Sequence, residues 1–209
     1  MTGKRHLNKY GSYAELARGE VQGRDYRVRV REKPHSPVLI VAPHGGMIEV
    51  GTSEIAHVVA GRDYSVFSFE GLKPYGTNRD LHITSHQFDH PECLALAARC
   101  EVVLSVHGCV GESQIHIGGL DAELSARLAQ QLSRAGFPVD PESQKYPGRH
   151  PLNICNRGSR QKGAQLEITY DLRTGDSRGA IARAVRLAIA GYQRPHRVRA
   201  LESEDRDTP

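Results

Sequence analysis

Two short, continuously apolar runs, each stopped abruptly near a histidine, constrain the fold of this chain most strongly. Residues 37–42 have the sequence PVLIVA and are followed by Pro-His-Gly-Gly, in which the histidine is His44. Residues 101–106 end in a similar way, at His107 and a glycine. Such runs are typical of strands that are buried on both faces of a sheet. Because helical patterns separate them along the chain, the sequence predicts an α/β protein.

The remaining periodic patterns extend this prediction to the whole chain. Alternating or apolar patterns predict further strands, and amphipathic patterns predict helices between them. The strands are expected at 26–31, 64–69, 114–117 and 165–169, the helices at 13–18, 52–60, 91–99, 121–135 and 178–192, and long loops at 70–90 and 138–162. We therefore expect a three-layer α/β/α fold with a central mixed, largely parallel sheet. Residues 1–209 form one predicted domain, with its core at 26–192 and a mobile tail at 194–209.

The composition excludes several classes of partner. The net charge of +4 is only mildly basic, tryptophan is absent, and no apolar run reaches the length of about 18 residues that spans a membrane. We therefore expect a monomer that binds neither nucleic acid nor a membrane. The first residues lack an apolar signal segment, which predicts a cytoplasmic protein with reduced thiols, released by host lysis if a phage encodes it. Eleven histidines are about double the ordinary usage, so a metal or proton-transfer site is expected.

Metal-binding and acid-base side chains lie at three of the predicted strand ends. His44 and Glu49 follow the first apolar run, His107 follows the second, and Glu167 lies in the last predicted strand. In an open α/β sheet, ligands bind beyond the carboxyl ends of the strands. Two histidines and a glutamate form a three-ligand zinc set that leaves a fourth position for water, and the remaining glutamate can accept a proton from that water.

Each of these residues, taken alone, also has an ordinary structural explanation. His44 could be a hydrogen-bonded turn residue beside two turn glycines, and Glu167 could be an ion-paired acid of the core. However, a carboxylate between Leu166 and Ile168 is unfavourable unless a charged group faces it. The four residues together therefore favour a metal site.

Five segments of the chain, taken in order, identify a family. They are PHGGMIEVGT at 43–52, NRDLHITS at 78–85, SVHG at 105–108, NICNR at 153–157 and QLEI at 165–168. Together they resemble the phage-type poly-γ-glutamate hydrolases, which are zinc enzymes with a metallocarboxypeptidase-like fold, and the resemblance covers about 26–192. It implies one zinc ion per chain, held by His44, Glu49 and His107, with Glu167 as the general base. Four residues separate the first two ligands, as in this family, whereas metallocarboxypeptidases usually have two there.

The resemblance also indicates which residues bind substrate. Asn78-Arg79 resembles a pair that binds the substrate carboxylate in related zinc acylases, and an arginine matches a carboxylate with two parallel hydrogen bonds. Arg79 is therefore expected to bind substrate and to help stabilise the oxyanion during catalysis. The predicted substrate-binding residues are Asn78, Arg79, His82, Asn156 and Arg157, and further candidate cations are Lys145, Arg149 and Lys162.

Three other features leave alternatives open. His82, His86 and His90 are spaced by four, which would suit a second metal on a helix, although the residues between them favour a loop. Cys109 lies two residues after His107 and could act as a nucleophile, but His107 is better used as a ligand. Two tyrosines could be proton donors, substrate walls or ordinary packing residues: Tyr75 and Tyr170.

These expectations lead to one function and two alternatives. We expect a zinc-dependent hydrolase that cleaves γ-glutamyl amide bonds in poly-γ-glutamate or a similar anionic polyamide or peptide. The first alternative is a zinc amidase or deacylase that acts on peptidoglycan peptides or N-acyl amino acids with the same residues. The second is a binding module for acidic polymers, which would have no use for a general base beside a metal.

Overall fold

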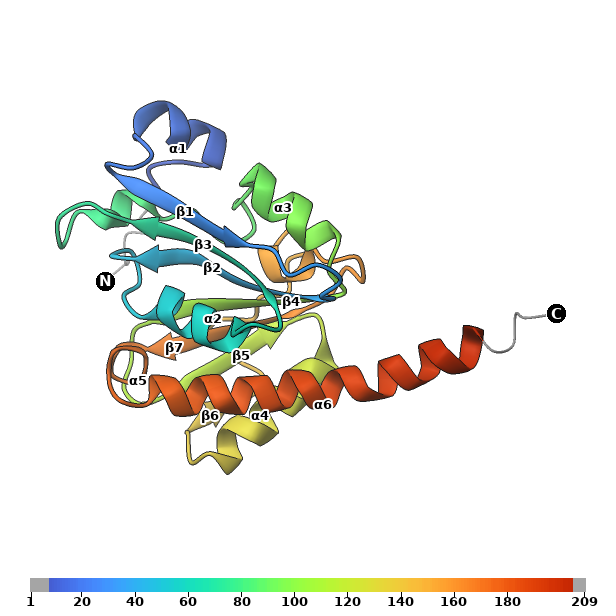
Figure 1. Ribbon diagram of the computed structural model, residues 1–209. Coiled ribbons are helices and arrows are strands. Elements are labelled where there is room, and N and C mark those ends of the chain that lie inside the picture. Colours follow the sequence, from blue (N-terminus) through green and yellow to red (C-terminus); the bar gives the residue numbers. More distant parts are fainter. Residues whose placement is uncertain (1–7, 205–209) are drawn as a thin grey trace.

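The centre of the molecule is a mixed β-sheet. The computed structural model describes residues 8–204, with side chains described through Gln193. The strands are β1 (Tyr26–Arg31), β2 (Val38–Gly46), β3 (Ser65–Gly71), β4 (Val102–Cys109), β5 (Ile115–Gly119), β6 (Val139–Asp140) and β7 (Ala164–Thr169). They are ordered β1-β3-β2-β4-β7-β5-β6; the β1–β3 and β5–β7 pairs are antiparallel and the other pairs are parallel (Figure 1). The predicted mixed, largely parallel sheet is therefore confirmed.

Helices cover both faces of this sheet and complete three layers. They are α1 (Tyr13–Gly19), α2 (Thr52–Ala60), α3 (Pro91–Ala98), α4 (Ala122–Arg134), α5 (Tyr170–Thr174) and α6 (Arg178–Glu204), with short 3-10 helices η1 (Asn78–Leu81) and η2 (Ile154–Asn156). Figure 1 shows α2, α4 and α6 on one side of the sheet and α1 and α3 on the other. Side chains of α2, α4 and α6 pack in one apolar cluster, and side chains of α1 and α3 pack in a second. The α/β/α architecture agrees with the prediction. Within the described residues, no helix combines the length and the apolarity that a membrane span requires.

The apolar run in β2 explains why the sheet needs both helical layers. Ile40 belongs to the cluster that contains side chains of α2 and α6, whereas Leu39 and Val41 belong to the cluster that contains side chains of α1 and α3. Successive side chains of a strand point to opposite faces, so both faces of β2 are apolar and buried. Burial contributes about 1.5–3 kcal/mol for each such side chain, which favours helices on both sides.

β2 and β4 are longer than the apolar runs from which we predicted them. β2 continues to Gly46 and β4 continues to Cys109, so His44 and His107 lie within strands rather than in the turns after them. The last residues of β2 pair with β3 after a shift in register. Apolar patterning cannot show such an extension, because the pairing there depends on neighbouring strands and not on side-chain polarity.

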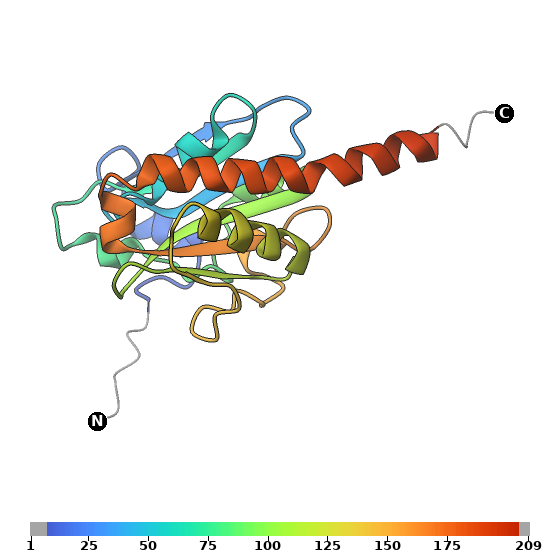
Figure 2. The same cartoon turned by 90° about the horizontal axis from the view of Figure 1, so that it is seen from below.

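The C-terminal helix is also longer than predicted. We expected it to end near residue 192, but α6 continues to Glu204 (Figure 2). The sequence after residue 193 is strongly charged and has no apolar stripe, so the helical period is hidden there. The expected mobile tail at 194–209 overlaps this part of α6, and residues 205–209 lie outside the described residues. Its mobility stays a prediction.

The parallel strands bring the predicted site to one edge of the sheet. β2, β4 and β7 run in the same direction, so their carboxyl ends meet at one edge. In the ladder between β4 and β7, His107 pairs with Glu167. Paired residues of neighbouring strands point to the same face, so these two side chains are neighbours.

Candidate active site

Four donor groups from different elements converge at this edge. His44 comes from β2, Glu49 from the turn after it, His82 from the end of η1 and His107 from β4. The Nδ1 atoms of His44 and His107 are 3.2 Å apart, and Nδ1 of His44 lies 3.3 Å from Oε1 of Glu49. Nε2 of His82 lies 3.9 Å from the same oxygen, and the rings of His82 and His44 stack with centroids 4.0 Å apart. The structure thus brings the three predicted ligands together and adds His82 to them.

Hydrogen bonds on the far sides of His44 and Glu49 aim their near atoms at this centre. Nε2 of His44 lies 2.7 Å from the carbonyl of Ile83. Because a carbonyl only accepts, Nε2 carries the proton and Nδ1 keeps a lone pair. Oε2 of Glu49 accepts from the backbone N–H of Gly108 at 2.7 Å, which leaves Oε1 facing His44. Partners of this kind orient the side chains that bind metals in proteins.

His107 and His82 are held in a similar way. Nε2 of His107 faces the hydroxyls of Ser105 at 3.1 Å and Ser85 at 3.4 Å, which leaves Nδ1 directed at the centre. Nδ1 of His82 donates to the side-chain oxygen of Asn8 at 3.0 Å, so Nε2 keeps its lone pair. All three imidazoles therefore direct one ring nitrogen at the same small volume.

The donor set and its spacing fit a zinc ion. A tetrahedral zinc with ligands at about 2.0–2.1 Å keeps neighbouring donor atoms roughly 3.3 Å apart. The distances from Nδ1 of His44 to Nδ1 of His107 and to Oε1 of Glu49, 3.2 and 3.3 Å, match this spacing. Without a cation or a proton between them, these electron-rich atoms would repel one another. Among the described residues, the group whose ligand atoms all lie within 4.8 Å of one another consists of His44, Glu49 and His82, so His82 is a further candidate donor beside His107.

Burial and mutual charge keep two of the histidines neutral. Burial lowers the pKa of His107 well below its usual value, and the charge of His44 lowers it further. The charge of His44, and then burial, lowers the pKa of His82 to about 3. Burial alone would also lower the pKa of His44, but the Glu49 carboxylate and the carbonyl of Ile83 together raise it by more. These pKa shifts together indicate that the centre stabilises a single positive charge, located beside His44 and Glu49.

Glu167 lies beside His107 in β7 and is a half-buried acid between two buried apolar residues. Burial, and secondly the nearby Glu49 carboxylate, raises the pKa of Glu167 well above its usual value. Its hydrogen-bond partner is the neutral amide of Gln165, whose Nε2 is 3.5 Å from Oε1. Among residues 8–193, no ion pair of Glu167 is formed. Glu167 is therefore free to exchange a proton rather than tied into a structural pair.

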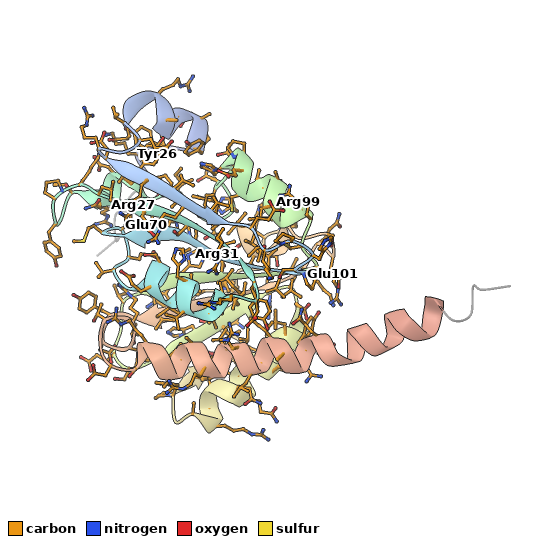
Figure 3. The ribbon with its side chains drawn as sticks, viewed as in Figure 1. Tyr26, Arg27, Arg31, Glu70, Arg99 and Glu101 are labelled. Carbon is orange, nitrogen blue, oxygen red and sulfur yellow. The ribbon has the colours of Figure 1, made fainter. Side chains whose placement is uncertain are left out.

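Glu70 shows how this fold pairs a structural acid. Glu70 is 2% exposed near the carboxyl end of β3, and its Oε2 lies 2.7 Å from the guanidinium of Arg27 on β1 (Figure 3). Its Oε1 accepts from the hydroxyl of Ser68 at 2.8 Å and lies 3.8 Å from Arg29. Sequence alone could not separate a core acid from a catalytic one at Glu167. The contrast with Glu70 favours the catalytic interpretation.

A cavity of about 550 Å³ opens beside two of the four donors. Glu49 and His82 form part of its wall, and Arg79 and Arg173 supply two cations. The apolar and aromatic part of the wall consists of Met47, Ile48, Val50, Tyr75, Val110 and Tyr170. Both tyrosines whose role was left open therefore lie where a substrate would contact them. The cavity suits an anion that also carries apolar segments.

Two predicted substrate-binding residues, Asn78 and Arg79, lie at this cavity in different settings. Arg79 is exposed, and its charge contributes to the lowered pKa of His82. The buried amide of Asn78 donates to the carbonyls of Lys73 and Pro74 at 2.8 and 3.1 Å and accepts from the N–H of Lys73 at 3.0 Å. Asn78 therefore fixes the turn that precedes Arg79.

The structure does not bring Asn156 and Arg157 to the cavity. The Asn156 side chain donates to two backbone carbonyls and accepts from two backbone N–H groups at distances of 2.8–3.2 Å, which uses its hydrogen-bonding capacity. Ser159, two residues after Arg157, donates its N–H to the carbonyl of Cys100. Cys100 lies before β4, roughly 23 Å of extended chain from His107. Asn156 and Arg157 are therefore not among the substrate-binding residues that we propose below.

The geometry gives no support to the other chemistries considered. Burial, and then the charge of Glu167, raises the pKa of Cys109 to about 11, so its thiol is protonated at neutral pH and is a poor nucleophile. His90 packs against Tyr13 with ring centroids 4.2 Å apart, whereas the ring of His86 lies 4.8 Å from a histidine of another loop. The three histidines spaced by four therefore do not form one site. The further candidate cations do not line the cavity: Lys145, Arg149 and Lys162.

Two residues that the sequence did not single out complete the site. Asn8 bonds to His82, 74 residues away, and no local pattern marks such a distant partner. Arg173 lines the cavity from α5 and is 8% exposed. Its one signal in the sequence is weak: it follows the strand of Glu167 by a few residues, where ligand-binding loops of α/β sheets lie.

Comparisons with known proteins show which family this chain resembles. The model of a family described as poly-gamma-glutamate hydrolase matches residues 10–176. The UPF0714 protein YndL of Bacillus subtilis (strain 168) is 41% identical over 167 residues, which is 78% of this chain and 65% of YndL. The structure of a bacteriophage poly-gamma-glutamate hydrolase has a TM-score of 0.85 at 28% identity, covering 90% of this chain and 99% of the other. A structure of YndL in its apo, zinc-free form has a TM-score of 0.81 at 33% identity, covering 88% of this chain and 98% of the other.

The range that the family model matches contains every candidate site residue discussed above except Asn8. The family match includes all four donor residues, the general-base candidate and both cavity arginines. The chain spans about two thirds of the length of YndL. The matched segment, residues 10–176, is most of this chain, and the fold agrees with it. The chain therefore belongs to the poly-γ-glutamate hydrolase family.

Proposed function

We propose that this chain is a zinc-dependent hydrolase that cleaves γ-glutamyl amide bonds in poly-γ-glutamate or a similar anionic polymer. The observation that carries the proposal is the convergence of two imidazole nitrogens and one carboxylate oxygen, 3.2 and 3.3 Å apart, beside the unpaired acid Glu167. Membership of the family supports the choice of substrate. A monomeric state and a cytoplasmic location remain expectations from the sequence.

We assign His44, Glu49 and His107 as the ligands of one zinc ion per chain. The distances from Nδ1 of His44 to the donor atoms of Glu49 and His107 support this assignment, and the outward-facing atom of each ligand already has a hydrogen-bond partner. When bound, zinc in such a three-ligand site lowers the pKa of a water molecule to near neutrality and polarises a carbonyl. Nε2 of His82 lies 3.9 Å from Oε1 of Glu49, farther than Nδ1 of His44 does. We therefore assign His82 to the residues that contact substrate rather than to the zinc ligands.

Glu167 would act as the general base. Its carboxylate would accept a proton from the attacking water and then pass that proton to the leaving amine, which avoids expelling an amine anion. Both causes of its raised pKa suit this role, because a buried and weakly paired carboxylate is a stronger base than one in water. Any cation that neutralises Glu49 would also favour the ionised form of Glu167.

The cavity supports an anionic, partly apolar substrate. A γ-linked polyglutamate alternates carboxylates with short methylene segments. Arg79 and Arg173 offer cations to the first, while Tyr75, Val110 and Tyr170 offer apolar surface to the second. Arg79 is exposed and would meet a carboxylate of the incoming chain.

The experiment that tests the proposal is incubation of zinc-loaded protein with high-mass poly-γ-glutamate, followed by sizing of the products. We expect shortened polymer with the wild type and no change in polymer size with Glu167→Gln. A parallel assay with peptidoglycan peptides and N-acyl amino acids tests the deacylase alternative. Intact polymer together with cleavage of either small substrate would overturn the substrate assignment. Binding of polymer without any cleavage would indicate a binding module instead.

A further inference from the structure

Arg173 lies in the cavity wall with one of its guanidinium-side donors unpaired among the described residues. The residue is 8% exposed in the wall of the cavity, and one end of its guanidinium, Nη1, donates to the carbonyl of Val50. Its Nε is buried and has no hydrogen-bond partner among residues 8–193. Buried donors are nearly always paired, so an unpaired one in a cavity wall points to a ligand.

Arg186 provides a matched comparison within the same chain. Arg186 donates Nη1 to the carbonyl of Val59 at 2.7 Å, and its guanidinium lies 5.4 Å from the ring centroid of Tyr64. Arg173 has the equivalent pair of contacts, with the carbonyl of Val50 and with a tyrosine ring at 5.1 Å.

The two arginines differ in their remaining donors. In Arg186, Nη2 pairs with the carboxylate of Asp63. For Arg173, no carboxylate among residues 8–193 forms an ion pair with the guanidinium, although Glu49 and Glu167 lie near enough to attract it. The surroundings of Arg173 therefore resemble those of the structural arginine Arg186, except that the described part of the chain supplies no paired carboxylate. A bound molecule would have to supply it.

Gly108 fixes how close this arginine lies to the candidate metal centre. A Cβ atom at Gly108 would lie 2.5 Å from Nε of Arg173, 2.7 Å from Cζ and 3.0 Å from Nη2, so only glycine leaves room for this part of the guanidinium. Gly108 directly follows His107 and also donates its N–H to Glu49. An anion on this edge would therefore lie next to the proposed reaction centre.

We propose that Arg173 binds the α-carboxylate of a glutamate residue that flanks the scissile amide, an inference that rests on the proposed function. Nε and Nη2 form one edge of the guanidinium, and such an edge donates two parallel hydrogen bonds to a carboxylate. In a γ-linked chain, one α-carboxylate is attached to the carbon that bears the scissile nitrogen. Arg173 therefore selects carboxylate-bearing substrates, while the exposed Arg79 contacts a more distant residue of the polymer.

The test compares two short γ-linked glutamate oligomers, one with a free α-carboxylate beside the scissile amide and one with a carboxamide there. For the wild type, we expect kcat/KM to be about 10-fold to 100-fold higher with the carboxylate, as the loss of a charge-assisted pair predicts. Arg173→Gln should bring this ratio close to one, and Arg173→Lys should leave it intermediate because lysine keeps the charge without the fork. The matched control, Arg186→Gln, should retain the wild-type ratio.

Several outcomes would overturn the inference. A wild-type ratio near one, or an unchanged ratio in Arg173→Gln, would show that Arg173 does not bind this carboxylate. If Arg173→Gln does not fold, Gly108→Ala decides, since it keeps the arginine but displaces the edge that binds, and an unchanged ratio in that variant also overturns the proposal. If the wild type cleaves neither oligomer, the proposed function has failed. The affinities of the wild type and of Arg173→Gln for the two oligomers, measured by calorimetry, then decide the role of Arg173 separately.

Discussion

Replacement of Glu167 by glutamine should change turnover and stability in opposite directions. Glutamine keeps the shape of the side chain but cannot accept a proton, so kcat should fall by about 10²-fold to 10⁴-fold. That range corresponds to about 2.7–5.5 kcal/mol of transition-state stabilisation. Zinc content and substrate affinity should change little, because the lost interaction belongs to the transition state.

The stability of the metal-free protein should rise with this change. Burial and the charge of Glu49 raise the pKa of Glu167, so the folded protein binds this proton more tightly than the unfolded chain does. The free energy of unfolding therefore falls as pH rises from the unfolded pKa, near 4.5, through the raised folded pKa. Glutamine cannot ionise, so at neutral pH the metal-free variant should unfold at a higher temperature than the metal-free wild type.

Glu70→Gln is the matched control for this prediction. Glu70 is buried, but its Oε2 is paired with Arg27 at 2.7 Å, and the side chain of Arg27 is 52% exposed. Loss of that pair should lower the free energy of unfolding by roughly 1–3 kcal/mol, with the exposure of Arg27 favouring the lower end. Thermal unfolding at several pH values, with zinc removed, measures both variants. If Glu167→Gln is destabilised as Glu70→Gln is, Glu167 is a structural acid and the assignment of the base is wrong.

Three further predictions concern the metal, the exposed cation and the response to acid. His44→Ala and His107→Ala should lose zinc, measured by elemental analysis, whereas His82→Ala should retain it; full occupancy in all three would contradict the ligand assignment. Arg79→Lys should lower kcat/KM on poly-γ-glutamate several-fold, because lysine cannot form the bidentate pair, and equal activity would exclude that contact. Burial lowers the pKa of His90 to about 4, so the folded state binds fewer protons than the unfolded state and loses stability as pH falls from about 6.5 to 4. His90→Phe should flatten this part of the pH–stability curve, and an unchanged curve would show that His90 does not contribute.

The central strands and most helices were predictable because burial leaves a local pattern. Leu39, Ile40 and Val41 contact opposite helical layers, so the run had to be apolar at every position. The ends of the strands were less predictable. His44 and His107 remain in β2 and β4 through pairing with neighbouring strands, which a polar side chain does not reveal.

The candidate metal centre was predictable because strand order carries its histidines to one edge of the sheet. Any parallel sheet that contains β2, β4 and β7 as neighbours places His44, His107 and Glu167 together. The positions of loops follow no such rule. The segment with Asn156 and Arg157 resembled a substrate-binding motif, yet its backbone hydrogen bonds hold it near the start of β4. Asn8 reaches the site only because the N-terminal segment folds back on the loop of His82.

Gly108 contacts both the candidate metal centre and the arginine proposed to bind the substrate carboxylate. Its backbone N–H holds Oε2 of Glu49, which turns Oε1 toward His44, and its missing side chain admits the guanidinium of Arg173. A larger residue would displace Arg173 and, through the same backbone, disturb the orientation of Glu49. The anion-binding edge and the candidate metal centre are therefore not independent features of the cavity. Because one residue of β4 positions both, a substrate carboxylate on Arg173 has a fixed distance to the groups that would cleave the neighbouring amide.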